Sequence, residues 1–546
     1  MLPTPPGFRA PGMVSSRLNL KILLQSLHLE AVLPCLLGLS WALSASAQEA
    51  GTLYVREYRV TGADRLPKLE VEEAVYPFLG PGRTPADVEA ARAALEKAYH
   101  DKGLQTVSVI VPEQDPRRGV IRLEVVEGKV GRLRITGSRY FLPSRIRREA
   151  PSMAEGEVPD MKRVEKEIIA LNRSSDRRVT PQLRPGVVPG TVDIDLEVED
   201  KLPLHGSFEL NNRNSANTSG LRLSGALSYG NVFQLGHTLG GSFQIAPQNL
   251  DDSEVYTGYY LARVSSGVSL MLQGTKQDSD VSTLGDAASI GRGHVIGLQA
   301  LYDLPTGEGF YQNFSLGMDY KHFSEDLVVG KSTISSPIEY YPISANYGAS
   351  WLAEKAFTEA NLGLTFHLRG MGTGVKDYAN KRYGADASFV YLKGDVAHTR
   401  DLKDNSQLFF KVQGQVASQA LVNNEQFSGG GLGSVRGYLE ATALGDNGAF
   451  GTFEYRTPSL IGTRDKNGEY ANEWRFHLFT EGGITGIYDA LPGQQKRYGL
   501  ASAGAGTRFK LKDHYNGSLD VGVPFIGQTD AEAGEVRVTF RGWADF

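Results

Sequence analysis

The segment from Gly429 to Tyr438 reads GGGLGSVRGY and carries one fixed cation, Arg436, among closely spaced glycines. Four glycines within five positions cost too much chain entropy for the interior of a strand or a helix. The segment is therefore predicted to be a loop that follows a special backbone path or comes close to other backbone. Its chemistry would be to place a guanidinium at a defined tip. An ordinary surface turn with a solvated arginine is the alternative.

Residue patterns for catalysis are absent from the sequence. We find no His-Glu-x-x-His metal motif, no Gly-x-Ser-x-Gly nucleophile elbow and no Gly-x-x-x-x-Gly-Lys phosphate loop. The ten histidines are scattered, and His477 is more simply a polar wall residue than a catalytic base. We therefore expect no enzyme activity, no catalytic residue, no metal site and no cofactor.

Residues 1–47 are typical of an export signal. Three basic residues precede an apolar stretch and a small-residue cleavage pattern, as in secretory signals. These features are Arg9, Arg17 and Lys21, then residues 31–43 and Ala45-Ser46-Ala47. A retained membrane helix is the alternative, but Pro34 interrupts the stretch, which is shorter than the ~20 residues that span a bilayer. The mature chain would begin near Gln48. Because the segment is long for a signal, a translation start at Met13 is the alternative to one at Met1.

Export also limits the chemistry of the mature chain. The one cysteine, Cys35, lies in the predicted signal, which leaves the mature protein without disulfides, thiol catalysis or cysteine metal ligands. Removing the signal's three bases and one acid from the chain's 57 Lys and Arg and 62 Asp and Glu leaves a net charge of about −7. This balance gives no electrostatic support for binding nucleic acid.

Two similar modules are predicted, at residues 52–128 and 129–200. The motif Arg59-Val60-Thr61-Gly62 recurs as Arg134-Ile135-Thr136-Gly137, which indicates an internal duplication. Both modules are expected to have the order βααββ. Such units have open sheet edges to which an extended segment can add by backbone pairing. A plain structural spacer is the alternative.

The elements of these modules follow from caps and periodicity. Those of the first module are a strand at 53–60, helices at 69–79 and 85–103, and strands at 106–111 and 119–126. Thr84 would cap the second helix and Gly103 would end it in a left-handed conformation. In the second module, Val164, Ile168 and Leu171 form the apolar stripe of a helix that precedes strands near 179–183 and 191–198.

From residue 202 to residue 546 the pattern changes to strands divided by polar, glycine-rich turns. Apolar and polar residues alternate within the strands, for example at 313–323 and 408–416. A soluble sandwich would show the same alternation, so alternation alone does not decide. The export signal, the lack of cysteine and strands long enough to cross a bilayer favour a closed transmembrane barrel with a water-filled lumen. We predict about sixteen antiparallel strands.

Several motifs carry a resemblance to a known family. They are Asp176-Arg177-Arg178-Val179-Thr180-Pro181, Leu183-Arg184-Pro185-Gly186, Val435-Arg436-Gly437-Tyr438, Gly445-Asp446-Asn447-Gly448 and Glu454-Tyr455-Arg456-Thr457-Pro458. With these motifs the two modules resemble POTRA domains. Residues 52–546 resemble the two-partner secretion transporters of the ShlB/FhaC/HecB hemolysin secretion and activation type. The resemblance implies that a loop at about 420–447 folds back into the pore.

In that family the loop arginine pairs with an acidic residue on the inner barrel wall, in a strand motif near Phe-x-Asp-x-Gly. This chain has Phe479-Thr480-Glu481-Gly482-Gly483, so that glutamate replaces aspartate. Glu481 shares strand parity with Arg475 and His477, and its carboxylate is expected to point into the lumen. An ion pair of Arg436 with Glu481 would hold a flexible loop at one depth.

The resemblance implies an outer-membrane translocator of type V secretion whose POTRA modules lie in the periplasm. The modules would capture an unfolded exoprotein with an N-terminal secretion domain, and this partner would cross the lumen extended and fold outside. Outer-membrane lipid and the barrel-assembly machinery are the other expected partners, the latter through the terminal Phe546. Family members commonly have a helix through the pore before the first module. Gln48 to Gly51 leave no room for one, so either the loop alone closes the pore or the signal is cut earlier.

Two other functions stay open at this stage. A barrel-assembly insertase resembling BamA or TamA shares POTRA modules and a related loop arginine, but two modules rather than more argue against it. A passive pore predicts substantial open conductance and no need for residues 52–200.

Overall fold

The computed structural model describes residues 52–546, apart from 283–288, 325, 330–331 and 464–469. The predicted signal at 1–47 and the stretch from Gln48 to Gly51 lie outside the described residues. The described chain forms two units, one ending at Pro203 and the other running from Leu204 to Phe546. No helix in the described ranges is both long enough and apolar enough to cross a membrane.

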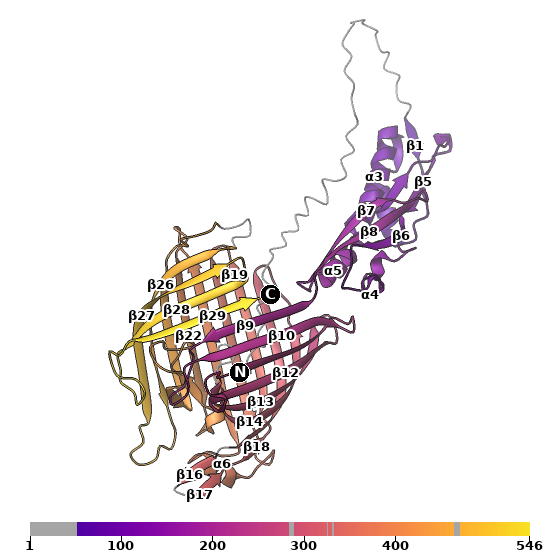
Figure 1. The fold of residues 1–546 in the computed structure, drawn as a ribbon. Coiled ribbons are helices and arrows are strands. Elements are labelled where there is room, and N and C mark those ends of the chain that lie inside the picture. The colour runs from indigo at the N-terminus through magenta and orange to yellow at the C-terminus, as the bar shows by residue number, and fades with distance from the viewer. Residues whose placement is uncertain (1–51, 283–288, 325, 330–331, 464–469) are drawn as a thin grey trace. The chain divides into compact units, whose positions relative to one another are not determined.

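The first unit contains two modules with related elements (Figure 1). Module one consists of β1 (Leu53–Val55), β2 (Glu57–Thr61), α2 (Lys68–Val75), η1 (Tyr76–Phe78), β3 (Gly80–Arg83), α3 (Pro85–Asp101), β4 (Val107–Ile110), η2 (Pro116–Arg118) and β5 (Val120–Glu127). Module two consists of β6 (Lys129–Thr136), α4 (Pro143–Arg148), η3 (Pro151–Met153), α5 (Met161–Leu171), β7 (Arg177–Pro185) and β8 (Thr191–Asp200). Their three-stranded sheets have the orders β2-β5-β4 and β6-β8-β7. In each sheet the central strand pairs parallel with the first strand and antiparallel with the other.

Local sequence signals account for most of module one. Asp87 N donates to Thr84 Oγ1 (3.3 Å) and Thr84 N donates to Asp87 Oδ2 (2.7 Å), so that α3 begins in a capping box. Just after α3, Gly103 has a φ of +99°. The predicted strand at 53–60 is divided at Arg56 into β1 and β2. Strand β3 was not predicted, because glycine and proline dominate its sequence.

The glycine that ends the repeated motif is required by the same backbone geometry in both modules. Gly62 follows β2 and Gly137 follows β6, with φ of +75° and +83°. A Cβ on Gly62 would lie 2.4 Å from the carbonyl oxygen of Val125, and a Cβ on Gly137 would lie 2.3 Å from that of Val198. Both positions therefore need glycine, and the duplicated sequence marks a duplicated close approach between backbones.

The second unit is a closed barrel of sixteen antiparallel strands. They are β9 (Leu204–Asn211), β10 (Arg222–Val232), β11 (His237–Ile245), β12 (Ser253–Arg263), β13 (Val268–Ser282), β14 (Ser289–Asp303), β15 (Phe310–Ser324), β19 (Ile343–Ala353), β20 (Ala356–His367), β21 (Phe389–Asp401), β22 (Gln407–Ala417), β25 (Asn447–Arg456), β26 (Glu473–Gly486), β27 (Arg497–Leu511), β28 (Tyr515–Pro524) and β29 (Arg537–Asp545). The predicted fold class is confirmed.

Smaller elements lie between the barrel strands. They are η4 (Leu250–Asp252), β16 (Asp326–Val329), β17 (Ser332–Ser335), β18 (Ile338–Tyr340), α6 (Val375–Lys381), η5 (Asn423–Glu425), β23 (Phe427–Gly429) and β24 (Ala443–Gly445). Strand β18 pairs with β15 just before β19 does so. Short connections such as 354–355 lie mostly at one end of the strands and long ones such as 368–388 at the other, although the connection between β25 and β26, 457–472, is also long. In outer-membrane barrels the short turns face the periplasm and the long loops face outward.

The barrel closes where β29 pairs with β9, from Arg541 opposite Asn211 to Asp545 opposite Ser207. Figure 1 shows the two strands side by side. Phe546 extends this seam, because its N–H donates to Gly206 O and its carbonyl accepts from Gly206 N, both at 2.9 Å.

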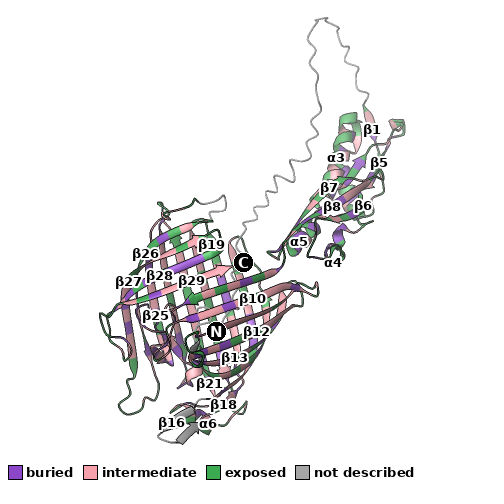
Figure 2. Ribbon diagram, in the orientation of Figure 1, coloured by how far each residue is buried: buried purple, intermediate pink, exposed green. Residues whose placement is uncertain are grey.

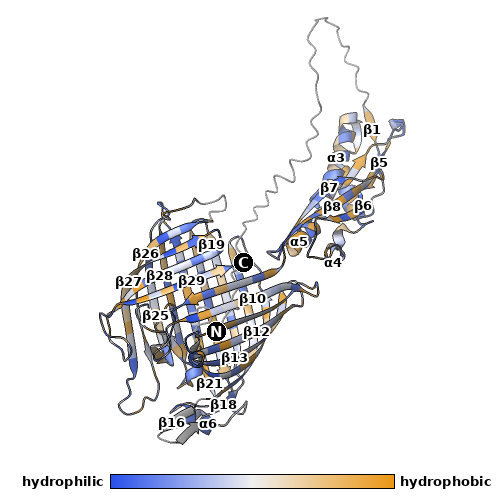
Figure 3. Cartoon of the chain, viewed as in Figure 1, coloured by the Kyte–Doolittle hydropathy of each residue, from blue (hydrophilic) through white to orange (hydrophobic). Residues whose placement is uncertain are grey.

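Side chains alternate between the two faces of the barrel wall. On β13, Leu270 and Leu272 are exposed on the outer face, whereas Met271 and Gln273 are buried on the inner face. Figure 2 and Figure 3 show this alternation of burial and hydropathy along the strands. The apolar face therefore points outward, as lipid requires, and the polar face lines the lumen.

Candidate functional site

Residues 418–446, between β22 and β25, form a loop that contacts inward-facing side chains of the barrel and is called the in-folding loop below. Strands β23 and β24 pair as its stem, from Phe427 opposite Gly445 to Gly429 opposite Ala443. Gly430 and Gly431 then have φ of +101° and +81°. The glycine run thus makes a left-handed backbone path at the top of the stem, which side chains would strain.

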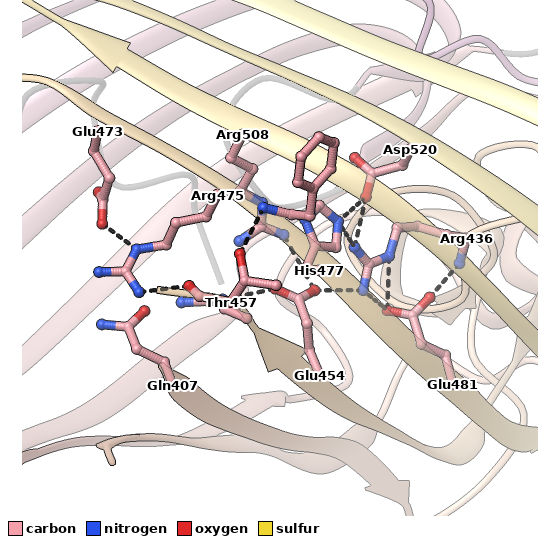
Figure 4. A network of polar contacts seen from close by, with 12 residues as sticks. Gln407, Arg436, Glu454, Thr457, Glu473, Arg475, His477, Glu481, Arg508 and Asp520 are labelled. Atoms are coloured by element: carbon pink, nitrogen blue, oxygen red, sulfur yellow. Dashed lines mark hydrogen bonds and ion pairs between the residues drawn. The ribbon is translucent and has the colours of Figure 1, made fainter. Parts of the chain in front are cut away.

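Arg436 lies near the tip of this loop, with only 3% of its surface exposed. Its Nε and NH2 atoms donate to Glu481 Oε1 at 3.0 and 2.7 Å. NH2 also donates to Glu454 Oε2 and NH1 to Asp520 Oδ1, both at 2.8 Å. Figure 4 shows the guanidinium enclosed by these three carboxylates, which come from β26, β25 and β28.

Further cations balance the charge of this cluster. Glu454 also accepts from Arg456 Nε (2.7 Å) and from Arg508 NH2 (3.2 Å). The network therefore holds three guanidinium groups and three carboxylates. His477 Nε2 lies 2.7 Å from Asp520 Oδ1 and connects β26 with β28. Charges taken out of water are tolerated only when paired in this way, and removal of one partner leaves the others uncompensated.

The remaining contacts of the tip are apolar or involve backbone. The Arg436 guanidinium carbon lies 3.6 Å from the ring centroid of Phe479, which points inward beside Glu481. Gly437 has a φ of +98° and packs on Gly522 of β28, where an added Cβ would lie 2.8 Å from Gly437 N. The Tyr438 hydroxyl donates to Ile526 O at 2.7 Å. Each member of the predicted motif is thus buried against the wall, Val435 included.

Glu481 stands where the parity of β26 places it. Trp474, Phe476 and Leu478 are exposed on the outer face, whereas His477 and Glu481 are buried on the inner face. The longer side chain of glutamate serves two purposes in this geometry. Oε1 accepts from the guanidinium, and Oε2 accepts from the backbone N–H of Arg436 at 2.5 Å. Glutamate at this position therefore binds both the guanidinium and the backbone of the loop.

Sequence reasoning missed two of the three carboxylates. Glu454 lies within the Glu-Tyr-Arg-Thr-Pro motif, and its even spacing from Thr452 and Arg456 predicts that it faces the lumen. Asp520 had the same parity signal on β28. The sequence pattern does not predict the pairing register of the strands, and it is this register that brings the three carboxylates together around one guanidinium.

Acidic residues tether the rest of the in-folding loop. Glu440 Oε1 accepts from Arg213 Nε at 2.8 Å, and both side chains are buried. Asp446, which is fully buried, pairs with both terminal guanidinium nitrogens of Arg382 and accepts from Tyr488 N at 2.7 Å. Glu425 forms a third tether, on another part of the wall.

The other predicted site residues lie elsewhere. In module two, Arg177 Nε and NH2 donate to Leu171 O at 3.0 and 2.7 Å, and the guanidinium lies over the Phe141 ring. Asp176 is buried and its carbonyl accepts from Lys201 N, and Arg178 stands opposite Glu199 on β8. This motif joins the end of α5 to β7. The ring of Phe546 lies over Gly206 at the barrel seam. In the part of the chain that the structure describes, no group of His, Cys, Asp and Glu could hold a metal ion.

A barrel with a polar interior, a loop buried inside it and a preceding pair of βααββ modules define a class of outer-membrane β-barrel proteins. A family model described as POTRA domain, ShlB-type, matches residues 53–128, and one described as haemolysin secretion/activation protein ShlB/FhaC/HecB matches residues 190–508. The second match covers more than half of the chain. The chain belongs to the haemolysin secretion/activation protein ShlB/FhaC/HecB family. The predicted family is confirmed, and with it the outer-membrane location and the periplasmic POTRA modules.

Individual relatives agree with this assignment. The chain is 24% identical over 387 residues to an outer membrane transporter CdiB of Dickeya dadantii, an alignment that covers 64% of this chain and 63% of that protein, just under two thirds. The solved structure of CdiB from Escherichia coli is similar, with a TM-score of 0.59, 19% identity and 93% of each chain covered. A structure of BamA from Haemophilus ducreyi has a TM-score of 0.56, 15% identity and coverage of 90% of this chain and all of that one. These structural likenesses concern the fold alone.

Proposed function

We propose that this protein captures one unfolded exoprotein in the periplasm and passes it through the barrel lumen, with the in-folding loop as the gate. The observation that carries the proposal is the buried Arg436, which binds carboxylates of β25, β26 and β28 at once. A loop bound in this way fills space that an extended chain needs, so transport requires its release.

The modules offer edges for the capture step. Within the described residues, the outer edges of β4 and β7 pair with no other strand. Strand β7 is nine residues long, enough for an extended segment to add by backbone hydrogen bonds. Ile110 on β4 and Leu183 on β7 are exposed and offer apolar contacts beside these edges. A partner with an N-terminal secretion domain is the class of ligand that we assign to them.

Replacement of Arg436 by alanine tests the gate. Arg436→Ala leaves three buried carboxylates with less cationic charge, so we expect a folded, inserted barrel whose loop is loose and whose export falls sharply. Export is measured as the amount of partner in the culture supernatant, and insertion as heat-modifiable mobility of the barrel. The matched control is Arg369→Ala, because Arg369 pairs with Asp386 at the exposed surface. Undiminished export by Arg436→Ala would contradict the gate.

The fold shared with BamA makes an insertase the competing function. Deletion of the whole protein separates the two. Loss of a dedicated transporter removes one large protein from the supernatant, whereas loss of an insertase lowers many barrel proteins in the outer membrane. We expect the first result. A chain lacking residues 52–200 would still conduct if the protein were a passive pore, but should export nothing.

A further inference from the structure

Glu425 is a buried acidic residue at the end of η5, early in the in-folding loop. Only 4% of its surface is exposed. Its Oε1 accepts from Lys321 Nζ and from the Tyr340 hydroxyl, both at 2.6 Å. Its Oε2 accepts from the Tyr391 hydroxyl at 2.8 Å. One loop carboxylate therefore binds donors from three wall strands, β15, β18 and β21.

The surroundings of this carboxylate are closely packed. Leu421 and Val422, from the same part of the loop, pack with Tyr340, Phe389 and Tyr391 in one apolar cluster. The Glu425 carbonyl also accepts from Gln415 Nε2 at 3.1 Å. Hydrogen bonds to a charged group are stronger in such a water-poor site than at a surface. The first limb of the loop is thus fixed to the wall independently of the tip.

The two charged contacts of the loop use different strands of the barrel wall. The donors to Glu425 lie on β15, β18 and β21, and the acceptors of Arg436 lie on β25, β26 and β28. Glu425 brings a negative charge to the first group of strands, and Arg436 brings a positive charge to the second. The residues between them include β23 and the left-handed pair Gly430 and Gly431.

We propose that Glu425 is a positioning residue for Arg436: it anchors the first limb of the loop on β15, β18 and β21, so that the tip meets its carboxylates on β25, β26 and β28. A buried ion pair is weak evidence for stability, because apolar residues of similar volume often stabilise as well or better. The pair is better explained as a device that fixes one arrangement. The inference rests on the proposed function only in taking the loop as the gate.

A cysteine reporter measures the position of the loop without any partner. The reporter is Ser434→Cys in a Cys35→Ser background, so that the chain carries one thiol, two residues before Arg436. Only 5% of the surface of Ser434 is exposed, so a docked loop protects this thiol. The purified barrel protein is treated with a membrane-impermeant maleimide, and the rate of modification reports release of the tip. Variants at the anchor are Glu425→Gln and the charge exchange Lys321→Glu with Glu425→Lys.

The control is Glu339→Gln. Glu339 lies on β18 next to Tyr340 and accepts from the hydroxyls of Tyr320 and Tyr341, so it is a carboxylate of the same wall that binds tyrosines but not the loop. We expect Glu425→Gln to speed modification on the order of tenfold or more, because the broken pair leaves a buried lysine unpaired. The charge exchange should restore a slow rate, and Glu339→Gln should not change it.

Equal rates for Glu425→Gln and Glu339→Gln would overturn the proposal, as would an exchange variant no slower than Glu425→Gln. If Glu425→Gln fails to insert, the proposal is tested with Tyr391→Phe, which removes a single donor to Glu425. Faster modification of the thiol at 434 by this variant supports the anchor, and an unchanged rate overturns it. Export is measured separately on the same variants. A released loop with normal export would contradict the proposed gate while leaving the anchor in place.

Discussion

The lumen of the barrel and the second periplasmic module use the same pair of groups, a guanidinium and a carboxylate, in opposite settings. In module two, Arg134 Nε and NH2 donate to Asp195 Oδ1 and Oδ2, both at 3.1 Å, and half of the arginine side chain is exposed. In the lumen, Arg436 and Glu481 meet at 2.7 Å with 3% of each side chain exposed. Geometry alone does not separate the two pairs, since both use two nitrogens of the guanidinium.

Burial decides what each pair can do. Water competes with an exposed pair and screens it, so that such a pair adds little. In a buried pair no water can replace a lost partner, so the loss of one member leaves the other charge buried and uncompensated. The lumen pair can therefore hold a loop in one place, whereas the module pair lies on an exposed surface where water weakens it.

The largest effect is expected when the buried pair is broken. Glu481→Ala removes both bonds to the guanidinium and the bond to the Arg436 backbone, at a cost to loop docking of about 3–5 kcal/mol. Glu481→Asp keeps the charge but is one methylene shorter, so it should retain only part of these contacts and show an intermediate effect. Maleimide modification of Ser434→Cys and export of the partner would measure both. If aspartate is as damaging as alanine, charge is not what holds the loop.

A smaller effect is expected from crowding the tip without changing any charge. Gly522→Ala would place a Cβ 2.8 Å from Gly437 N and 3.0 Å from the carbonyl carbon of Arg436. Because backbone must move to make room, we expect a cost of about 1–3 kcal/mol to loop docking, read out by the same modification rate. Gly542→Ala on β29 is the matched control, since nothing lies within 4 Å of its added Cβ. Equal rates for the two variants would show that the tip tolerates displacement.

The smallest effect is expected from the exposed pair. The hydrogen bond from Arg134 lowers the pKa of Asp195, so the pair stabilises module two above the pKa of an unfolded aspartate and loses this contribution as the pH falls. Arg134→Ala should slightly raise hydrogen exchange of β6 and β8 in the intact protein at pH 7, and this effect should shrink as the pH falls through the lowered pKa of Asp195. An effect as large as that of Glu481→Ala would refute the role that we assign to burial.

Much of the fold could be predicted from sequence because its signals are local. Thr84, Gly103 and the alternation of strands such as β15 depend on neighbours within a few residues. The pairing of Arg436 with Glu481 could also be predicted, because strand parity indicates that the glutamate faces the lumen and the family resemblance indicates its partner.

The tethers of the in-folding loop could not be predicted from sequence, because the residues that pair in them are far apart in the chain. Glu425 and Lys321 are separated by 104 residues, and Glu440 and Arg213 by 227. Parity shows that Lys321 faces the lumen but not which loop residue will meet it. That information lies in the register of the strands and in the path of the loop, which no local pattern encodes.

The seam between β9 and β29 sets an order of events during biogenesis. These two strands begin and end the barrel in sequence, yet they must pair with each other. The ring can be sealed only after every intervening strand has been synthesised and placed, so β9 must wait with an open edge while more than three hundred residues are added. An edge left open that long invites pairing with another chain, so that anything that shields β9 until the last strand arrives would favour closure over aggregation.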